Sequence, residues 1–387
     1  MKYPGLYIHI PFCAKKCNYC DFLSAGNTSK EDHSLYIEAL LCELRYYADS
    51  DIIFDTVYIG GGTPSLLDCS SIARIMDSIR SDFRLTEHAE VTVEANPDSL
   101  DKRKLLTYRE IGINRLSIGA QSMDDGLLSF LGRIHTVDTF LRSYYSARNC
   151  GFQNISVDLM FSIPGQTAEL WMDGLEKVVG LDPEHISFYS MQIEEGTPFH
   201  KLWEEGTLRP VNDTEDRTMY HRTINRLENA GYLHYEISNA AKPGCESRHN
   251  LKYWSMGEYL GIGLGAHSYI GGIRRSNETD LNKYVRIAAL PPRRGILNGV
   301  GPCTVWNHKN TKEDEMSDYM FTGLRKVSGI KLSEFKERFG TALCEIYADP
   351  VIKHKKTGLL KIDPDNDRLS LTLNGMDLFN QVLIDFI

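Results

Sequence analysis

The 387-residue sequence lacks a long uncharged hydrophobic run. The best candidate for a membrane span, residues 256–273, contains Glu258, His267 and six glycines, so we expect a glycine-rich turn region there instead. The first residues, MKYPGLYIHI, lack the long apolar core of a signal peptide and predict a strand. These absences predict a cytoplasmic protein that does not span a membrane.

The sequence also lacks an excess of basic residues. It contains 43 Lys and Arg against 52 Asp and Glu, a formal net charge of −9 at pH 7. A general binder of nucleic acid or of membrane surfaces needs a basic footprint, so we expect no nucleic acid among the partners. Hydrophobic residues make up 42% of the chain, which is typical of a globular protein with a sizeable core.

A disulfide framework is absent as well, because the nine cysteines are odd in number and six of them are scattered. We treat the scattered ones as small core or surface residues: Cys42, Cys69, Cys150, Cys245, Cys303 and Cys344. The other three, Cys13, Cys17 and Cys20, lie within eight residues of each other. A metal site in a reducing compartment explains this arrangement better than secretion does.

Short β-branched runs alternate with segments of helical apolar spacing over the first 230 residues. The predicted strands are 7–10, 57–60, 91–94, 116–119, 155–158 and 186–189. The predicted helices are 35–47, 72–79, 100–111, 140–148, 170–179 and 219–227. Such alternation favours repeated βα units on a parallel sheet. Six units favour a partial (β/α)6 barrel over a doubly wound sheet.

Polar or glycine residues follow the ends of five consecutive predicted strands. They are 9–20, the run Gly60-Gly61-Gly62-Thr63-Pro64, Glu94-Ala95-Asn96-Pro97, Gly119-Ala120-Gln121 and Asp158. The carboxyl ends of barrel strands carry the active site, so one shared pocket explains the pattern better than five local turns. Glycines let the backbone approach a ligand closely. Glu94, Gln121, Arg133 and Asp158 suit an ammonium, a carboxylate and a ribose.

Residues 291–301, PPRRGILNGVG, predict a linker to a region whose sequence pattern differs from that of the preceding residues. Thr311 and Asp314 have the spacing of a helix cap, and Asn374-Gly375 precedes a last apolar helix. Between them we expect helices at 316–325 and 333–339 and a hairpin of 359–363 with 369–373.

Helices with a hairpin predict a small winged-helix-like domain. We therefore divide the chain into a core, residues 1–300, and a small C-terminal domain, residues 301–387. Residues 311–387 carry 11 Lys and Arg against 13 Asp and Glu, a net charge of −2. That balance favours a packing or lid role over DNA binding.

Three thiolates on one short loop can converge on an inorganic centre. A structural zinc site needs four ligands, and His9 would have to fold back from its strand to be the fourth. A [4Fe–4S] cluster normally takes four cysteines, so three leave one iron open for an exogenous ligand. The spacing favours such a cluster over zinc or over three buried core cysteines.

These motifs together resemble the radical S-adenosylmethionine (SAM) superfamily. More narrowly, they resemble the branch that contains oxygen-independent coproporphyrinogen III oxidases and HemW-type haem chaperones. The motifs are YIHIPFC at 7–13, the cysteine trio, 60–64, EANP at 94–97, GAQS at 119–122, DLMFSIPGQT at 158–167, HNLKYW at 249–254 and GLGAHS at 263–268. The region after residue 300 also resembles the small domain of this branch.

The resemblance implies a radical SAM barrel whose [4Fe–4S] cluster is held by Cys13, Cys17 and Cys20, with SAM on the open iron. In the superfamily, one electron from the cluster cleaves SAM to methionine and a 5′-deoxyadenosyl radical, and the protein orients and shields these groups. The positions that match SAM contacts of the family are Tyr7, Tyr19, Gly61, Gly62, Thr63, Glu94, Gln121, Arg133 and Asp158.

Two features favour the chaperone over the oxidase. Oxidases that resemble this chain carry another cysteine two residues after the third cluster ligand, and Phe22 stands at that position here. They also carry an extension before the first strand. His249, Tyr253 and Trp254 match the H-N-x-x-Y-W signature of the chaperones. His249 could be an axial haem ligand, and the two aromatic rings could stack on the macrocycle. Alternatively, His249 caps a turn and the rings are core.

Three hypotheses therefore stand. The first is a haem chaperone that binds haem and transfers it to an acceptor haemoprotein, for which a membrane haemoprotein of respiration is an option. The second is an oxygen-independent coproporphyrinogen III oxidase, which decarboxylates two propionates in porphyrin biosynthesis. The third is a radical SAM enzyme with another substrate. The sequence does not decide whether the chain is an enzyme, and the family allows a homodimer.

Overall fold

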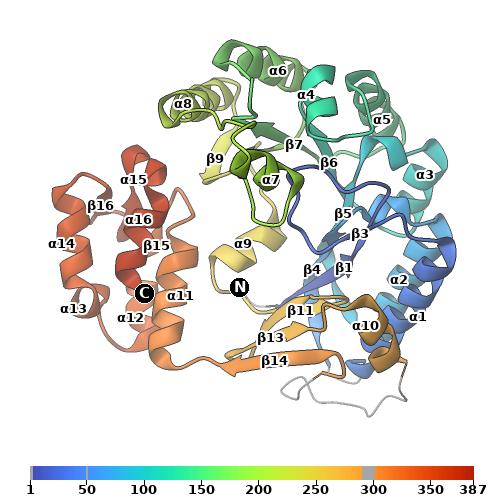
Figure 1. The fold of residues 1–387 in the computed structure, drawn as a ribbon. Coiled ribbons are helices and arrows are strands. Elements are labelled where there is room, and N and C mark those ends of the chain that lie inside the picture. The colour runs from blue at the N-terminus through green and yellow to red at the C-terminus, as the bar shows by residue number, and fades with distance from the viewer. Residues whose placement is uncertain (1–2, 49–50, 290–300) are drawn as a thin grey trace.

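The computed structural model describes residues 3–48, 51–289 and 301–387. Six adjacent parallel strands form the centre of its main sheet, and they follow one another in chain order (Figure 1). They are β1 (Gly5–Ile10), β4 (Ile53–Gly61), β5 (Arg84–Ala95), β6 (Arg115–Gln121), β7 (Ile155–Phe161) and β8 (His185–Ser190). All six correspond to predicted strands, and the partial (β/α)6 barrel is confirmed.

Helices cover the convex face of this sheet (Figure 1). They are α1 (Lys30–Tyr46), α2 (Cys69–Asp82), α3 (Lys102–Glu110), α4 (Asp125–Phe130), α5 (Val137–Asn149), α6 (Ala168–Gly180) and α8 (Asp213–Asn229). The six predicted helices are among them. Each of the seven begins after a residue whose side chain accepts a backbone N–H of the first turn, which satisfies an otherwise unpaired donor. The main hydrophobic core lies between these helices and the strands.

The concave face of the sheet is polar. Successive side chains of a strand point to opposite faces. In β6, Leu116 and Ile118 belong to the core, whereas Arg115 and Ser117 line a cavity on the other side. Sequence reasoning treated the strands as apolar runs and did not anticipate this polar interior, which carries the candidate site.

Further strands extend the sheet at both edges. On one side β11 (Tyr259–Ile262) pairs parallel with β1, and β12 (His267–Ile270), β13 (Ile273–Asn277) and β14 (Thr304–Lys309) continue antiparallel. On the other side β10 (Asn239–Ala241) and β9 (Leu233–Glu236) follow β8. Two short strands, β2 (Phe12–Cys13) and β3 (Ala25–Gly26), form a separate pair.

The prediction of a turn region at 256–273 was wrong in part, since β11 and β12 occupy much of it. The glycines make the connections between strands. Gly271 and Gly272, with φ of 60° and 71°, join β12 to β13 as a two-residue hairpin loop, for which positive φ at both positions is favoured. In the described residues no helix is long and apolar enough to cross a bilayer.

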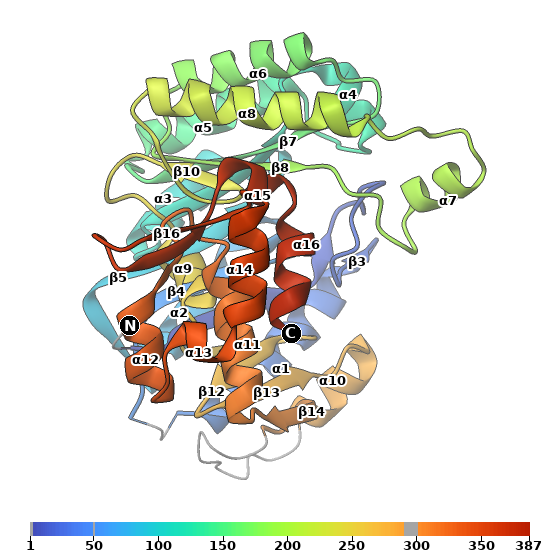
Figure 2. The same ribbon diagram turned by 90° about the vertical axis from the view of Figure 1, so that its left-hand side faces the viewer.

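Three short helices lie between β8 and β14. They are α7 (Pro198–Glu204), α9 (Arg248–Trp254) and α10 (Leu281–Ala288). In Figure 2, α7 projects away from the rest of the barrel on the side of β3. Of the predicted linker, residues 291–300 lie outside the described residues.

The C-terminal region has a second hydrophobic core and stands beside the barrel (Figures 1 and 2). Its elements are α11 (Lys312–Gly323), β15 (Ile330–Lys331), α12 (Leu332–Phe339), α13 (Leu343–Ile346), α14 (Ala348–Lys356), β16 (Leu360–Asp363), β17 (Arg368–Leu371), α15 (Leu373–Asp377) and α16 (Phe379–Leu383). The predicted hairpin is β16 with β17. The Thr311–Asp314 capping box is confirmed. Asn374 and Gly375 lie inside α15, which Thr372 caps, and the predicted last helix after them is α16.

Candidate functional site

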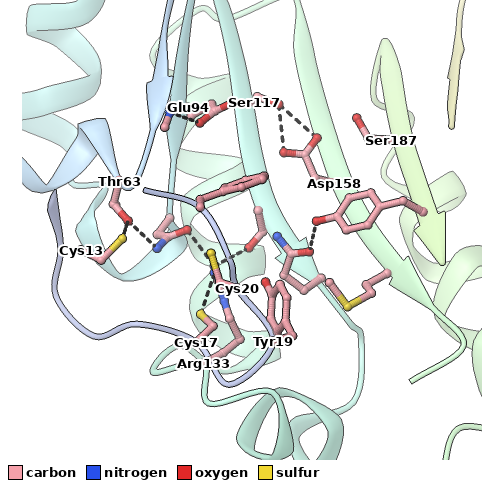
Figure 3. Close-up of a pocket in the computed structure, with 18 of the residues that line it drawn as sticks. Cys13, Cys17, Tyr19, Cys20, Thr63, Glu94, Ser117, Arg133, Asp158 and Ser187 are labelled. Atoms are coloured by element: carbon pink, nitrogen blue, oxygen red, sulfur yellow. Dashed lines mark hydrogen bonds between the residues drawn. The ribbon is translucent and has the colours of Figure 1, made fainter. Parts of the chain in front are cut away.

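The three clustered cysteines lie on a loop at the carboxyl end of β1, which crosses the mouth of the barrel (Figure 3). Asn18 anchors this loop from both sides. Its backbone N–H donates to Leu131 O at 3.0 Å and its side-chain Nδ2 to Phe130 O at 2.8 Å, while Phe199 N donates to Asn18 O at 3.0 Å. The chain segments after β6 and β8 therefore hold the loop in place.

The three thiols of the loop are free. Cys13 accepts from Thr63 Oγ1 at 3.5 Å, and Cys17 accepts from Arg133 Nη1 at 3.7 Å (Figure 3). Burial raises the pKa of Cys20 to about 11, and the neighbouring Cys17 and Cys13 thiols add to the shift. A bound cationic centre would reverse this shift, because metal ligation favours the thiolate.

Among the described residues, no three His, Cys, Asp or Glu side chains meet around one ion-sized point. A [4Fe–4S] cluster has a different requirement, because each cysteine ligates a separate iron. Three half-buried thiols on one loop, with N–H and O–H donors aimed at two of them, fit that donor set.

The loop covers a cavity of about 440 Å³, within the usual range for small-molecule sites. Of the nine predicted SAM residues, eight line it together with the three cysteines: Tyr19, Gly61, Gly62, Thr63, Glu94, Gln121, Arg133 and Asp158. Tyr7 does not line it. Its hydroxyl lies 3.0 Å from His9 Nδ1, and His9 Nε2 lies 2.9 Å from Leu23 O, so this pair supports the loop from behind.

Two half-buried carboxyls face the cavity. Glu94 accepts from Tyr58 Oη at 2.7 Å and from Gly61 N at 2.9 Å, and burial raises its pKa to about 7. Asp158 accepts from Ser117 Oγ at 2.9 Å and from Ser156 Oγ at 3.0 Å, and burial raises its pKa as well. Glu94 can therefore gain or lose a proton more readily near neutral pH than an exposed carboxyl can.

Neighbouring residues hold the amide and guanidinium groups. Tyr189 Oη donates to Gln121 Oε1 at 2.7 Å, and the backbone of Gln121 has a φ of 63°. Arg133 Nη2 donates to Asn96 Oδ1 at 2.7 Å and to Gly119 O at 2.9 Å. Sequence reasoning missed Tyr189, whereas Asn96 and Gly119 belong to the strand-end motifs that it placed in the pocket.

The glycine run also packs closely against the protein's own backbone, and its predicted contact with a ligand stays a prediction. An added Cβ on Gly62 would meet Phe12 O at 2.8 Å and Ile10 O at 3.0 Å, which are backbone atoms. Gly62 N donates to Ile10 O at 2.8 Å and Thr63 N to Phe12 O at 2.7 Å. The run borders the cavity, and a close approach that requires glycine is the one to the chain that leads into the cysteine loop.

The predicted haem residues lie in α9 and do not line the cavity, but Asn250 of the same helix does, and the His249 ring stacks on Tyr58, a lining residue, at 5.2 Å between centroids. His249 is 1% exposed, with Nδ1 2.9 Å from Thr56 Oγ1 and Nε2 2.8 Å from Tyr253 Oη. Burial lowers the pKa of His249 to about 3.

The Trp254 ring lies 4.3 Å from the Arg325 guanidinium. Ser247 and not His249 caps α9, and Tyr253 and Trp254 are half-buried. The axial-ligand role and the alternative of a structural cluster both stay predictions.

The chain matches two family models. Residues 7–178 match the radical SAM superfamily, and residues 310–378 match the HemN C-terminal domain. Among solved structures, the fold is similar to coproporphyrinogen III oxidase (HemN) from Escherichia coli, described as a radical SAM enzyme. The TM-score is 0.83 with 22% identity, over 99% of this chain and 90% of that one.

Curated relatives similar over nearly the whole chain are named "Heme chaperone HemW". The relative from Bacillus subtilis is 36% identical over 98% of each chain. The one from Lactococcus lactis is 34% identical over 98% of this chain and 96% of its own, and the one from Escherichia coli is 37% identical over 71% and 73%. These similarities, with the confirmed barrel, show that the chain belongs to the HemW-type family of the radical SAM superfamily.

Proposed function

We propose that this protein binds haem and transfers it to an acceptor haemoprotein, and that it carries a [4Fe–4S] cluster and SAM. The observation that carries the proposal is similarity over 98% of the chain to relatives named haem chaperones. Phe22 adds support, because it stands where the resembling oxidases carry a further cysteine, and its side chain is 63% exposed.

Cys13, Cys17 and Cys20 would hold the cluster. When bound, the cluster and SAM supply one-electron chemistry that generates a 5′-deoxyadenosyl radical. The protein's own part is to fix the loop through Asn18 and to direct donors at sulfur from Thr63 and Arg133. Such hydrogen bonds to sulfur stabilise the thiolate form and tune a cluster's potential.

The cavity beneath the loop would hold SAM. Its polar groups are already oriented by the protein. Glu94 and Gln121 accept hydrogen bonds from the hydroxyls of Tyr58 and Tyr189. Arg133 donates a hydrogen bond to Asn96. A ligand ammonium beside Glu94 would lower the raised pKa of that carboxyl and favour its charged form. Preoriented groups of this kind reduce the entropic cost of binding.

Haem ligation at His249 requires a local rearrangement. Both ring nitrogens already have partners, so an iron bond to Nε2 would replace the contact with Tyr253. Tyr253→Phe removes that competing partner and leaves the ring in place. The proposal therefore predicts that His249→Ala weakens haem binding, whereas Tyr253→Phe retains or strengthens it.

The experiment is an anaerobic haem titration of the cluster-reconstituted protein, followed by absorption. We expect saturable binding that His249→Ala weakens and Tyr253→Phe retains or strengthens. His88→Ala, which removes an exposed imidazole, is the matched control and should bind haem like wild type. If His249→Ala binds haem normally but melts at a lower temperature, His249 is a structural residue and not the ligand.

If wild type shows no saturable haem binding, the chaperone proposal fails. The same preparation is then assayed for SAM-dependent conversion of coproporphyrinogen III under reducing anaerobic conditions. Product formation there would establish the oxidase instead. For the acceptor, the proposal names a haemoprotein, with membrane haemoproteins of respiration as the class to test first.

A further inference from the structure

The cavity continues beyond the predicted SAM residues to the opposite end of the barrel. Gln121 ends β6 and lies near the cysteine loop, whereas Arg115 begins the same strand, and both line the cavity. Six steps along a strand span about 20 Å. His185, which begins the parallel strand β8, lines the same end. We call Arg115 and His185 the barrel floor.

Arg115 is the unusual member of the barrel floor. Its side chain is 1% exposed, and its Nε has no hydrogen-bond partner. Within the part of the chain that the structure describes, its guanidinium has neither an ion pair nor a side-chain hydrogen bond. Buried charges are normally paired, because an unpaired charge in a low-dielectric interior is costly.

The carboxyls of the barrel have other partners. Asp158 accepts from serine hydroxyls, and Glu94 accepts from Tyr58 and Gly61. Glu90 accepts the backbone N–H groups of Arg248 and His249, both at 3.1 Å, at the start of α9. Each of these acceptors is therefore committed to a donor other than Arg115.

The neighbour of Arg115 on the floor does not pair with it. Both nitrogens of His185 have hydroxyl partners at 2.8 Å, Ser156 Oγ and Tyr235 Oη. Glu94 and Asp158 act on Arg115 as nearby charges and not through a hydrogen bond or an ion pair. The floor thus presents to the cavity a guanidinium to which no acidic side chain of the described residues is bonded.

We propose that Arg115 is the centre of an anion subsite at the barrel floor, which binds the carboxylate of an organic ligand that enters from the cysteine-loop end. The planar guanidinium fork matches a carboxylate in a bidentate geometry. A monoanion neutralises the single positive charge of Arg115. A dianion such as a phosphate would add negative charge beside Glu94 and Asp158, so the carboxylate is favoured.

The ligand that fits this position is a porphyrin, through a propionate, because SAM bound to the open iron would keep its methionyl carboxylate at the cysteine-loop end of the cavity. The inference therefore rests on the proposed haem binding, and SAM serves as a probe that should not depend on Arg115. The test compares each acid with its methyl ester, which removes the negative charge and leaves the rest of the ligand. The four probes are haem, haem dimethyl ester, SAM and SAM methyl ester.

The dissociation constants of these probes are measured for wild type, Arg115→Gln and Arg115→Lys, with the cluster reconstituted. Arg142→Gln, an exposed arginine on α5, is the matched control and should bind all four probes as wild type does. We expect Arg115→Gln to weaken haem binding about 10-fold or more and to leave the binding of haem dimethyl ester and of both SAM probes unchanged. Arg115→Lys should lie between, because it keeps the charge but loses the fork.

A loss of affinity for haem alone supports a propionate subsite at Arg115. A loss of affinity for SAM overturns it. Equal effects of Arg115→Gln on an acid and on its ester, or no effect on any probe, overturn the proposal. If Arg115→Gln does not fold, the Arg115→Lys comparison decides by the same criteria, since lysine retains the buried charge.

Discussion

The substitution Gly62→Ala tests whether the glycine run serves the cysteine loop. An added Cβ would lie 2.8 Å from Phe12 O, 3.0 Å from Ile10 O and 3.0 Å from Phe12 N. These are backbone atoms and cannot turn aside as a side chain could. The substitution should therefore displace the strand end or the entry to the loop, and weaken the 2.8 Å bond from Gly62 N to Ile10 O.

Overpacking of this kind costs about 1–3 kcal/mol. A cost of that size lowers the melting temperature by about 2–4 °C per kcal/mol in a mid-sized protein. The larger effect should fall on the cluster, because the displaced segment leads directly to Cys13. We expect Gly62→Ala to fold with a modestly lower melting temperature and to retain much less iron and sulfide after anaerobic reconstitution.

Gly180→Ala is the control for this experiment. Gly180 ends α6, an added Cβ there would meet nothing within 4 Å, and its φ is not positive. It should bind iron like wild type and be equally or slightly more stable. If Gly62→Ala binds as much iron and sulfide per chain as Gly180→Ala, the assigned role of the glycine run is wrong.

The remaining predictions concern charge and anchoring. Burial raises the pKa of Glu43 from its ordinary value of 4.5 to about 7, so the native chain retains a proton that the unfolded chain loses. The free energy of unfolding should fall as pH rises from about 4.5 to about 7. In urea unfolding, Glu43→Gln should make this dependence on pH shallower. An unchanged dependence on pH would contradict this reasoning. Asn18→Ala should lose the 2.8 Å bond to Phe130 O and speed proteolysis of the cysteine loop, whereas equal cleavage rates would refute the anchoring role. Arg133→Met should lower cluster yield and shift the cluster's absorption by removing the donor to Cys17, and an unchanged spectrum would rule out that contact.

The elements of the barrel could be predicted because each has a strong local signal. All six predicted strands and six predicted helices exist, since the alternation of β-branched runs with helical spacing reflects burial against one sheet. The site could be placed for a similar reason, because strand ends of a parallel sheet meet at one edge. Eight of the nine predicted SAM residues line one cavity for this reason.

What escaped prediction depends on contacts between distant residues. Arg115 begins a strand and gave no sign of facing a polar interior until the curvature of the sheet was known. The role of Gly62 depends on the chain at Phe12, fifty residues away in the sequence. His249 has the pattern of a haem ligand, but the hydroxyls that engage its ring come from Thr56 on β4 and from Tyr253 one turn on.

Haem transfer is the central claim, and one measurement tests it most directly. The reconstituted protein is loaded with one equivalent of haem, separated from free haem, and mixed anaerobically with apomyoglobin as a model acceptor. If the protein transfers haem, the haem spectrum of the acceptor appears while that of the donor is lost. The unloaded protein is then recovered and still carries its cluster. A preparation that retains no haem through the separation, or that retains it and never yields it to the acceptor, would contradict the account.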